Sequence, residues 1–455
     1  MATTAASRVG LSKQHLGLAR IDESPSGCIE VANELLQKNH DEYHMYFRDL
    51  AGHNHIAHSV LSVLAMGGGP EELKRAYDDG EGIQRPLPPL DLAVVDTLGD
   101  PDHFRARMNQ LPEYTNFLCF FEREIDAKGW REVVGEYCFS RTPLAEYMLA
   151  QLYEGLFHPI LHLGFGVEFE QPSLVAEGLA HAASHDPGDI DIFFQRSEEL
   201  ARSGSVSPRP LVELYHEVHS NEKIRTASRL SDGAFRVRDG VLGRAMDEVV
   251  ALAAQFQVPA DERGIRRATA EIISCAAHCA GAAHKPGKVR KLDFFTMHNV
   301  TSSLSVDALA RQPWIGAADK VRLLEWKARL DLVWYASCAA AELRLDEYIV
   351  GYEPTLSRGM DWRSMYKAIG GHHDDGHVAK FVRALKNGQD VARPFEEEEG
   401  QGAASFPVKG DLWFRVAQIA YDTTADEDTI QVENKWVWGA GFDPMWARFP
   451  DVKPA

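Results

Sequence analysis

Apolar residues recur every three or four positions along most of the chain, which is the pattern of amphipathic helices. Strict alternation of apolar and polar residues, the pattern of a half-buried strand, is scarce. We therefore predict an all-α protein. The predicted helices cover 29–50, 55–66, 71–77, 144–157, 174–184, 211–220, 245–256, 271–284, 320–348 and 378–386.

Glycine and proline mark the ends of several predicted helices. The run 67–69 is three glycines that follow the second helix, and Pro70 stands at the first position of the next one. Histidine clusters recur in every third of the chain, so we predict a single large multi-helix domain over residues 15–450 after a flexible N-terminus at 1–14. Turn-rich breaks are predicted at 85–89, 187–188, 203–210 and 393–402.

Composition narrows the class of protein. Acidic residues number 67 against 48 basic ones, and a net charge of −19 repels phosphate backbones, so we expect no nucleic-acid partner. The most apolar stretch, 332–341, is too short to span a bilayer, and we expect no membrane association. The first residues lack the apolar core of a secretory signal. We expect a cytoplasmic protein whose six cysteines are reduced, buried thiols.

The spacing of the histidines indicates a metal site. His55 and His58 lie three residues apart, His158 and His162 lie four apart, and the segment 372–380 reads HHDDGHVAK. Residues three or four apart share one face of a helix, and imidazole ligands suit iron, copper or zinc.

Two more histidines join these candidates. His298 stands alone beside small polar residues, and His373 lies four positions before His377. Spacing leaves two interpretations open, namely hydrogen-bonded core histidines or ligands of a shared metal. We expect the remaining close pairs to be surface or supporting residues. These pairs are 40/44, 181/185 and 216/219.

Five segments in the same order resemble the questin oxidase-like family of fungal polyketide pathways. The resemblance covers roughly residues 15–450. The segments are NHDEYHMYFRDLAGHNHIAHSVLSVLAMG, GLFHPILHLGFGVEF, MHNVTSSLS, DDGHVAKFVRAL and WVWGAGFD.

The resemblance implies an α-helical oxygenase that opens the central ring of anthraquinones. In a relative, a non-haem iron is held by four histidines and a lysine carboxylated by carbon dioxide. When the ligands of that relative are transferred to this sequence, the resemblance implies that the lysine corresponds to Lys380 and one histidine to His377. We also expect Lys380 and His377 to be the catalytic residues. The other implied ligands are His58, His162 and His298, with His55, His158 and His373 as supporting residues or alternative ligands.

Carboxylation would turn the Lys380 cation into an anionic carbamate, a carboxylate-like ligand suited to non-haem iron. Asp374 and Asp375 admit two interpretations. They either hydrogen-bond the ligand histidines and fix their tautomers, or they form an acidic pair that favours the start of a helix.

The expected substrates are an aromatic polyketide of the anthraquinone class and O2, with a benzophenone-type product. NADPH would act only indirectly, through quinone reduction by a separate reductase, because the chain has no G-x-G-x-x-G dinucleotide motif. A flat substrate needs an apolar pocket with aromatic walls. The candidates are Tyr153, Phe157, Phe165, Phe294, Phe295 and Trp362.

Three alternatives remain open. The first is an NADPH-dependent Baeyer–Villiger-type monooxygenase that acts on the same substrates. The second is a zinc hydrolase with a carboxylated lysine, and the third is a helical scaffold without enzymatic activity.

Overall fold

The computed structural model describes residues 4–50, 52–399, 405–425 and 433–452, and it confirms the all-α class. Within these ranges the strands are β1 (Leu292–Asp293) and β2 (Trp436–Val437), which pair in parallel. In the same ranges, no helix is long and apolar enough to cross a membrane. All six cysteines are buried free thiols, as predicted.

The chain forms two compact units built from interleaved segments. Unit 1 comprises Met1–Asp191, Ser305–Gly316 and Asp375–Ala379, and unit 2 comprises Ile192–Leu304, Ala317–Asp374 and Lys380–Ala455. The predicted boundary between a flexible N-terminus and one domain over 15–450 stays a prediction.

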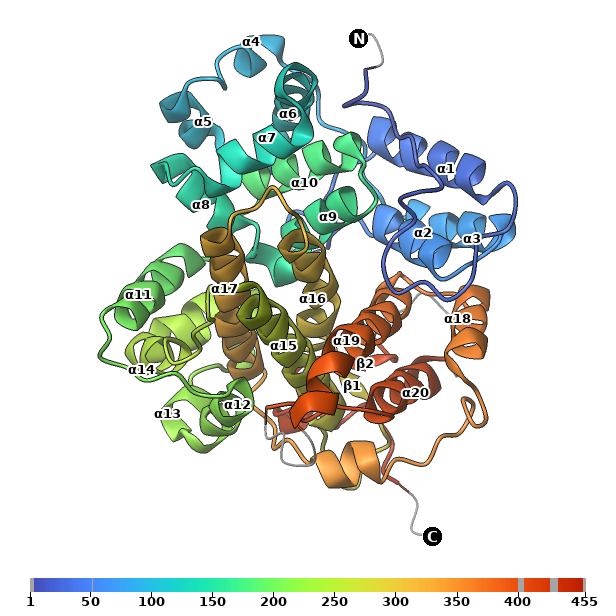
Figure 1. Cartoon of the computed structure of the whole chain (residues 1–455), viewed down its shortest axis with the longest axis vertical. Helices are drawn as coiled ribbons and strands as arrows, with labels where there is room; N and C mark the ends of the chain where they lie inside the picture. Colours follow the sequence, from blue (N-terminus) through green and yellow to red (C-terminus); the bar gives the residue numbers. More distant parts are fainter. Residues whose placement is uncertain (1–3, 51, 400–404, 426–432, 453–455) are drawn as a thin grey trace. The chain divides into compact units, whose positions relative to one another are not determined.

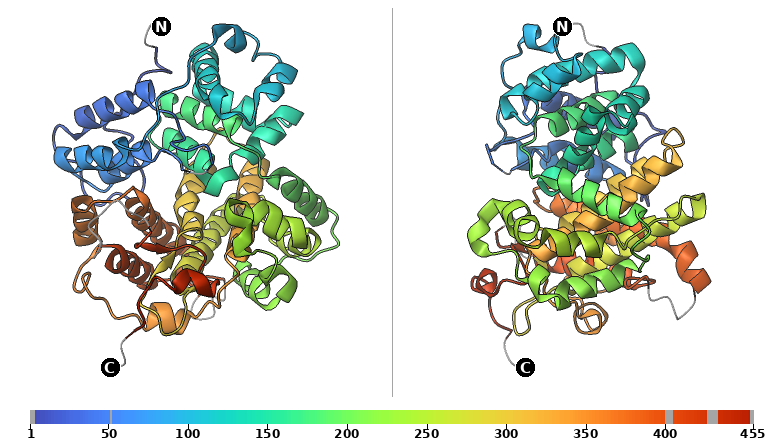
Figure 2. Two further views of the ribbon diagram at one scale, coloured as in Figure 1. Left: turned by 180° about the vertical axis from the view of Figure 1, so that it is seen from behind. Right: turned by 90° about the vertical axis from the view of Figure 1, so that its left-hand side faces the viewer.

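The helices of unit 1 lie in the first part of the chain. They are α1 (Cys28–Glu42), α2 (Ile56–Ala65), α3 (Pro70–Glu81), α4 (Leu92–Val95), α5 (Pro101–Arg107), α6 (Tyr114–Lys128), α7 (Trp130–Val134), α8 (Pro143–Gln151), α9 (Glu154–Glu168) and α10 (Pro172–Ser184). Figure 1 shows α10 packed beside α9, and Figure 2 shows α1, α2 and α3 gathered together.

The contact between α9 and α10 positions the residues discussed below. A Cβ built on Gly178 of α10 would lie 2.7 Å from the backbone of Leu163 on α9. Only glycine therefore allows the two backbones to approach this closely. The close packing places the side chains of α10 beside the histidines of α9.

Unit 2 is built around two long buried helices, α15 (Glu262–Ala282) and α17 (Ala317–Ser337). Its other helices are α11 (Ile190–Arg202), α12 (Leu211–Ser220), α13 (Glu222–Arg225), α14 (Gly243–Ala253), α16 (Met297–Ala310), α18 (Trp362–Gly371), α19 (His377–Glu399) and α20 (Leu412–Thr424). Helices α11, α16 and α19 contain residues of both units.

Short turns of 3₁₀ or π helix connect some of these elements. They are η1 (Leu111–Glu113), η2 (Gly135–Phe139), η3 (Leu230–Phe235), η4 (Arg236–Leu242), η5 (Asp346–Val350) and η7 (Asp443–Trp446).

The beginning of the described chain is fastened to α1. Val9 and Leu11 are buried in the core cluster of unit 1. The backbone N–H of Val9 donates to Gln37 at 2.9 Å, and that of Leu11 donates to Asn33 at 2.8 Å.

Two helices end earlier than the hydrophobic pattern predicts. The predicted helix 29–50 stops at Glu42, because Tyr43 is extended and forms a bridge with Pro86. The predicted helix 320–348 stops at Ser337, because Ala339 and Ala340 adopt the left-handed backbone conformation that ends helices.

The predicted break at 393–402 is wrong up to residue 399, and residues 400–404 lie outside the described ranges. Helix α19 continues through Pro394 to Glu399. Ala392 and Phe395 are buried on its inner face, and the Trp413 indole N–H donates to Glu396 at 2.9 Å. These contacts hold the helix together where proline removes one backbone donor.

Candidate metal centre

Histidines of unit 1 converge from α2, α9, α10 and the first turn of α19. The sequence-predicted residues brought together are His55, His58, His158, His162, Asp375 and His377, while His298, His373, Asp374 and Lys380 belong to unit 2. The ligand assignment within the set stays a prediction, and the geometry of each residue follows.

Helix α2 presents its histidines from its first turn. His55 is the residue that caps the helix, and the side chain of Asn54 accepts the backbone N–H of Ile56 at 2.9 Å. His58 lies one turn further in and is fully buried, with its ring stacked on Phe165 at a centroid distance of 5.0 Å.

A left-handed turn places His158. Gly155, Leu156 and Phe157 all have positive φ, at 53°, 57° and 64°. Regular helix begins only at His158, one position before Pro159, so the predicted helix 144–157 is wrong at its end. Left-handed backbone costs roughly 1–2 kcal/mol for each non-glycine residue, and such strain concentrates where a functional side chain must be positioned.

The rings of His55 and His158 face each other. Their Nε2 atoms lie 2.8 Å apart and their planes differ by 3°. The Nδ1 of His55 donates to the carbonyl of Asp375 at 3.0 Å, and the Nδ1 of His158 donates to that of Gly155 at 2.6 Å. A carbonyl only accepts, so in the neutral tautomers both Nε2 atoms carry lone pairs. Lone pairs at 2.8 Å repel unless a proton or a metal cation lies between or beside them.

Asp375 holds His377 in the same tautomer. Its carboxylate accepts the Nδ1–H of His377 at 2.7 Å, so the lone pair of this buried ring is on Nε2. The rings of His55 and His377 meet edge to face at 4.6 Å. Gly376, which separates Asp375 from His377 in the sequence, has φ +90°, and a Cβ there would lie 2.1 Å from Ser59 Oγ. The contact of Asp375 is the one expected of a residue that orients a metal ligand.

A hydrogen-bonded chain runs from His58 through Glu177. His58 Nε2 lies 3.1 Å from His162 Nδ1, and His162 Nε2 donates to Glu177 at 2.5 Å. The other oxygen of Glu177 accepts from His40 at 2.6 Å, and His40 also donates to Glu122 at 2.9 Å.

The charges in this chain follow from burial and hydrogen bonding. Burial lowers the pKa of His40, but its bonds to Glu122 and Glu177 outweigh burial and raise the pKa to about 10. Burial alone would raise the pKa of Glu177. Its interactions with His162 and His40 outweigh burial and lower the pKa to about 2. Near neutral pH, Glu177 is therefore an anion between two imidazole rings, and it fixes the lone pair of His162 on Nδ1.

Sequence reasoning missed four residues of the cluster. Glu177 was not a candidate, His53 was not singled out, and His181 and His185 were expected at the surface or in supporting positions. All four are buried, and His40 and His44 are buried as well, so the surface expectation is wrong for both of those pairs. The available signal was the acidic residue at 177 inside an apolar helix, one turn before His181.

In unit 2, His298 stands beside an aromatic wall. Its Nδ1 donates to the carbonyl of Phe294 at 2.8 Å, which leaves the lone pair on Nε2. Phe294 stacks on Trp438 at 4.5 Å with the planes 2° apart, and Phe295 is nearly parallel to Trp334 at 6.1 Å. These four aromatic residues are half-buried, and we call them the aromatic wall.

The other unit 2 candidates lie around the start of α19. Lys380 is 2% exposed and lies on α19 three residues after His377. Lys435 donates to the backbone carbonyl of His373 at 2.8 Å and forms an ion pair with Asp374 at 3.6 Å. Asp374 thus contacts a lysine, in contrast to the bond of Asp375 with a histidine.

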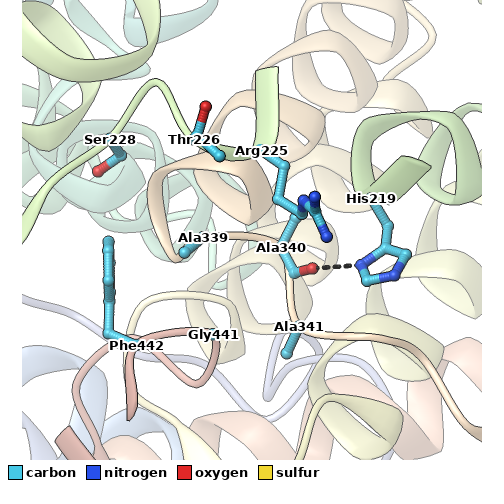
Figure 3. Close-up of a pocket in the computed structure, with 9 residues that line it drawn as sticks. All are labelled: His219, Arg225, Thr226, Ser228, Ala339, Ala340, Ala341, Gly441 and Phe442. Atoms are coloured by element: carbon cyan, nitrogen blue, oxygen red, sulfur yellow. Dashed lines mark hydrogen bonds between the residues drawn. The ribbon is translucent and has the colours of Figure 1, made fainter. Parts of the chain in front are cut away.

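Two cavities of the described structure are lined by other residues. One in unit 2 has a volume of about 440 Å³ and is shown in Figure 3, where His219 donates to the carbonyl of Ala340. One in unit 1 has a volume of about 430 Å³ beside His44 and Arg85. The aromatic residues predicted to form a substrate pocket line neither cavity.

Comparison with known proteins identifies the class. A Baeyer-Villiger oxidase, notM, from Aspergillus sp. (strain MF297-2) is 60% identical over 446 residues, which cover 98% of each chain. The Baeyer-Villiger oxidase ptaJ of Pestalotiopsis fici is 56% identical over 99% of this chain and 100% of its own. A questin oxidase from Aspergillus terreus is 53% identical over 97% of this chain and 98% of its own. These relatives show that the protein belongs to a class of oxidoreductases.

The family model described as questin oxidase-like matches residues 52–385, which include the histidine cluster. The chain therefore belongs to the questin oxidase-like family, as the sequence motifs predicted.

Proposed function

We propose that this protein is an oxygenase that opens the quinone ring of an anthraquinone by oxidative carbon–carbon cleavage, as part of polyketide secondary metabolism. The product is a benzophenone-type acid. The questin oxidases among its relatives support the substrate class, and the histidine cluster supports a metal-dependent reaction.

The observation that carries the proposal is the pair of Nε2 atoms of His55 and His158, 2.8 Å apart with both Nδ1 protons held by carbonyls. The residues fit a divalent metal, because a cation relieves the repulsion between the lone pairs. Nδ1 donors held by carbonyls or carboxylates are typical of metal-binding histidines. The group formed by His55, Asp375 and His377 has its ligand atoms within 4.8 Å of one another.

Iron(II) is the metal that this proposal assigns, and it would supply the oxidation of the substrate by O2. His377 is the ligand that we assign from α19, with Lys380 as a carbamate on the next turn of the same helix. His298 and one member of each pair, 55/58 and 158/162, complete the proposed set, and the metal content of single variants decides between the members.

Residues of the chain would orient the metal ligands and bind the substrate. Asp375 and the carbonyl acceptors keep each Nε2 deprotonated, so the donor atoms need no rearrangement before binding. Glu177 holds the Nε2–H of His162 and keeps its Nδ1 as the donor. The half-buried aromatic wall offers stacked flat surfaces for a planar substrate beside His298.

A second candidate is an NADPH-dependent Baeyer–Villiger monooxygenase that acts on the same substrates. The names of notM and ptaJ favour it. In that reaction one oxygen atom enters the carbon skeleton as an ester, and hydrolysis of the ester then opens the ring. The zinc hydrolase and scaffold alternatives gain no support from these oxidase relatives.

The test supplies the iron-loaded protein with a chemically reduced anthraquinol and isotopically labelled O2, without nicotinamide. We expect ring-opened product with two labelled oxygen atoms. Turnover that needs NADPH and places one labelled atom in the product would establish the monooxygenase in its place. No turnover under either condition would refute both.

A further inference from the structure

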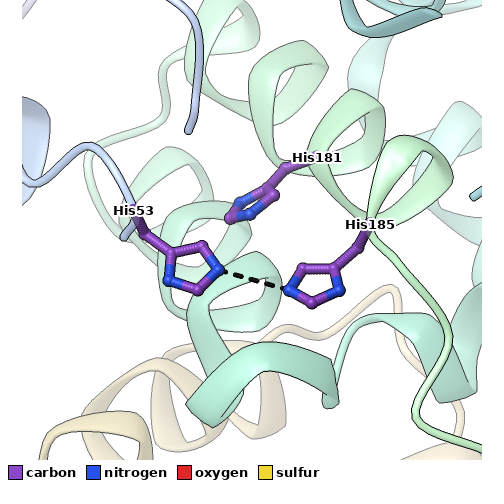
Figure 4. A group of neighbouring side chains, drawn as sticks. All are labelled: His53, His181 and His185. Carbon is purple, nitrogen blue, oxygen red and sulfur yellow. Dashed lines mark hydrogen bonds between the residues drawn. The ribbon is translucent and has the colours of Figure 1, made fainter. Parts of the chain in front are cut away.

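A second group of histidines in unit 1 lies beside the residues assigned above, since the ring of His53 stacks on that of His158 at 3.9 Å. His53 precedes α2, His181 lies in the last turn of α10, and His185 is the residue that ends α10. Figure 4 shows the three rings turned toward one another. One nitrogen of each lies within 4.8 Å of those of the others, and all three side chains are buried.

The tautomer of His185 is fixed. Its Nδ1 donates to the carbonyl of Asp186 at 2.7 Å, so the neutral ring carries its lone pair on Nε2. That atom points at the Nε2 of His53, 3.2 Å away. Two nitrogens bound to one tetrahedral zinc, each about 2.0–2.1 Å from the ion, are separated by about 3.3 Å. The observed spacing matches this value.

His181 supplies the independent observation. Its side chain is 1% exposed, and neither ring nitrogen has a hydrogen-bond partner within the described part of the chain. A buried polar group without a partner is costly. A metal ion that accepts its lone pair removes most of that cost.

The backbone of the left-handed turn borders the group. A Cβ on Gly155 would lie 2.0 Å from His185 Nε2 and 2.9 Å from His53 Nε2. Glycine therefore keeps the space in front of both donor atoms clear, and any other side chain would enter it.

We propose that His53, His181 and His185 form a second metal site that binds a divalent transition ion, with Zn²⁺ as the best match. Three neutral imidazoles without a carboxylate suit zinc better than a hard cation. The ion links the segment before α2 to the end of α10, so its function is to hold these two parts of unit 1 together. None of its three ligands is assigned to the iron of the proposed function, although His53 is in ring contact with His158.

The test counts metal ions and does not use activity. Metal-free protein is titrated with Co²⁺, and the visible absorption of four-coordinate cobalt is followed together with thermal unfolding. We expect the wild type to bind one equivalent that His181→Leu does not bind and His377→Ala retains. Bound metal should raise the melting temperature of the wild type by about 5 °C or more beyond the rise seen in His181→Leu.

Tyr46→Phe is the matched control, because it keeps the aromatic ring that packs edge-on against His181 at 5.0 Å and changes none of the three proposed ligands. The Tyr46→Phe variant should bind the same equivalent of Co²⁺ as the wild type. If His181→Leu fails to fold, His185→Gln replaces it. A wild-type titration without cobalt bands, or equal binding in His185→Gln and the wild type, would overturn the proposal. A protein that binds no iron but still binds Co²⁺ through His181 would support the second site.

Discussion

The Nε2 atoms of His55 and His158 point at each other across 2.8 Å, and each ring is held from behind by a backbone carbonyl. The two histidines come from segments about a hundred residues apart. Neither ring can turn away without losing its carbonyl bond, so the pair is ready to bind a cation.

Removal of one ring should remove the metal. We expect His158→Ala to reduce bound iron and ring-opening activity by about tenfold or more, because the donor atom and the reason for the left-handed turn are both lost. Metal analysis and product formation measure the two effects. His216→Ala, at an exposed histidine of α12, is the control and should change neither. Full iron content in His158→Ala, together with loss of iron in His162→Ala, would assign the ligand of this pair to His162.

The carboxylate of Asp375 should tune the metal through His377. Asp375→Asn keeps an oxygen acceptor for the Nδ1–H but loses the charge, while Asp375→Ala loses both. We expect iron affinity to fall about 10-fold in the first variant and up to about 100-fold in the second. Competition with a chelator measures affinity. Asp374→Asn, whose carboxylate faces Lys435, should bind iron normally, and an equal loss there would point to a general charge effect.

The aromatic wall should control substrate binding. Trp438→Leu removes the ring stacked on Phe294, and one aromatic pair contributes about 0.5–1.5 kcal/mol beyond its buried area. We expect KM for an anthraquinol to rise about 3- to 10-fold with a smaller change in kcat. Trp438→Phe should retain most of the binding. Trp362→Leu is the control, because Trp362 packs on Phe414, outside the wall. An unchanged KM in Trp438→Leu would exclude the wall from the site.

Glu154 should make stability depend on pH. Burial raises its folded pKa from 4.5 to about 8, even though Gly188 donates a backbone N–H to it at 2.8 Å. The folded state therefore holds a proton that the unfolded state releases, and the free energy of unfolding falls as pH rises from 4.5 to 8. Glu154→Gln should be more stable than wild type by about 1–3 kcal/mol at pH 8 and similar near pH 4.5. Chemical denaturation at several pH values measures this.

The exposed Glu132 provides the matched control. Glu132→Gln should follow the wild type at every pH. A Glu154→Gln curve parallel to the wild type would mean that Glu154 is ionised in the folded protein.

Local signals in the sequence predicted the fold class and several helix ends. Gly67 adopts φ +85° after α2, and Pro70 opens α3, as their residue types indicated. The helix 211–220 begins and ends where its pattern predicted. Helix α16 was missed, because a helix that is buried on all its faces lacks a clear alternation of apolar and polar sides.

The candidate site was predictable only in part. The spacing of residues 55 and 58, and of 158 and 162, identified helical faces, and the family motifs added His377. The positions of Glu177 and His181 depend on the close contact of α10 with α9, which no local pattern encodes. The carbonyl bonds that fix each tautomer are also tertiary contacts. Sequence therefore predicted candidate ligands but could not choose between the members of each pair.

Two conditions restrict the residue at position 155, namely the positive φ and the space available for a Cβ. They predict different tolerance to substitution. If its positive φ were the only demand, asparagine would be an acceptable replacement, because it tolerates the left-handed conformation. The nitrogens of His185 and His53 also occupy the space that any Cβ would need. A saturation library selected for folded, metal-bound protein should therefore return glycine alone at this position.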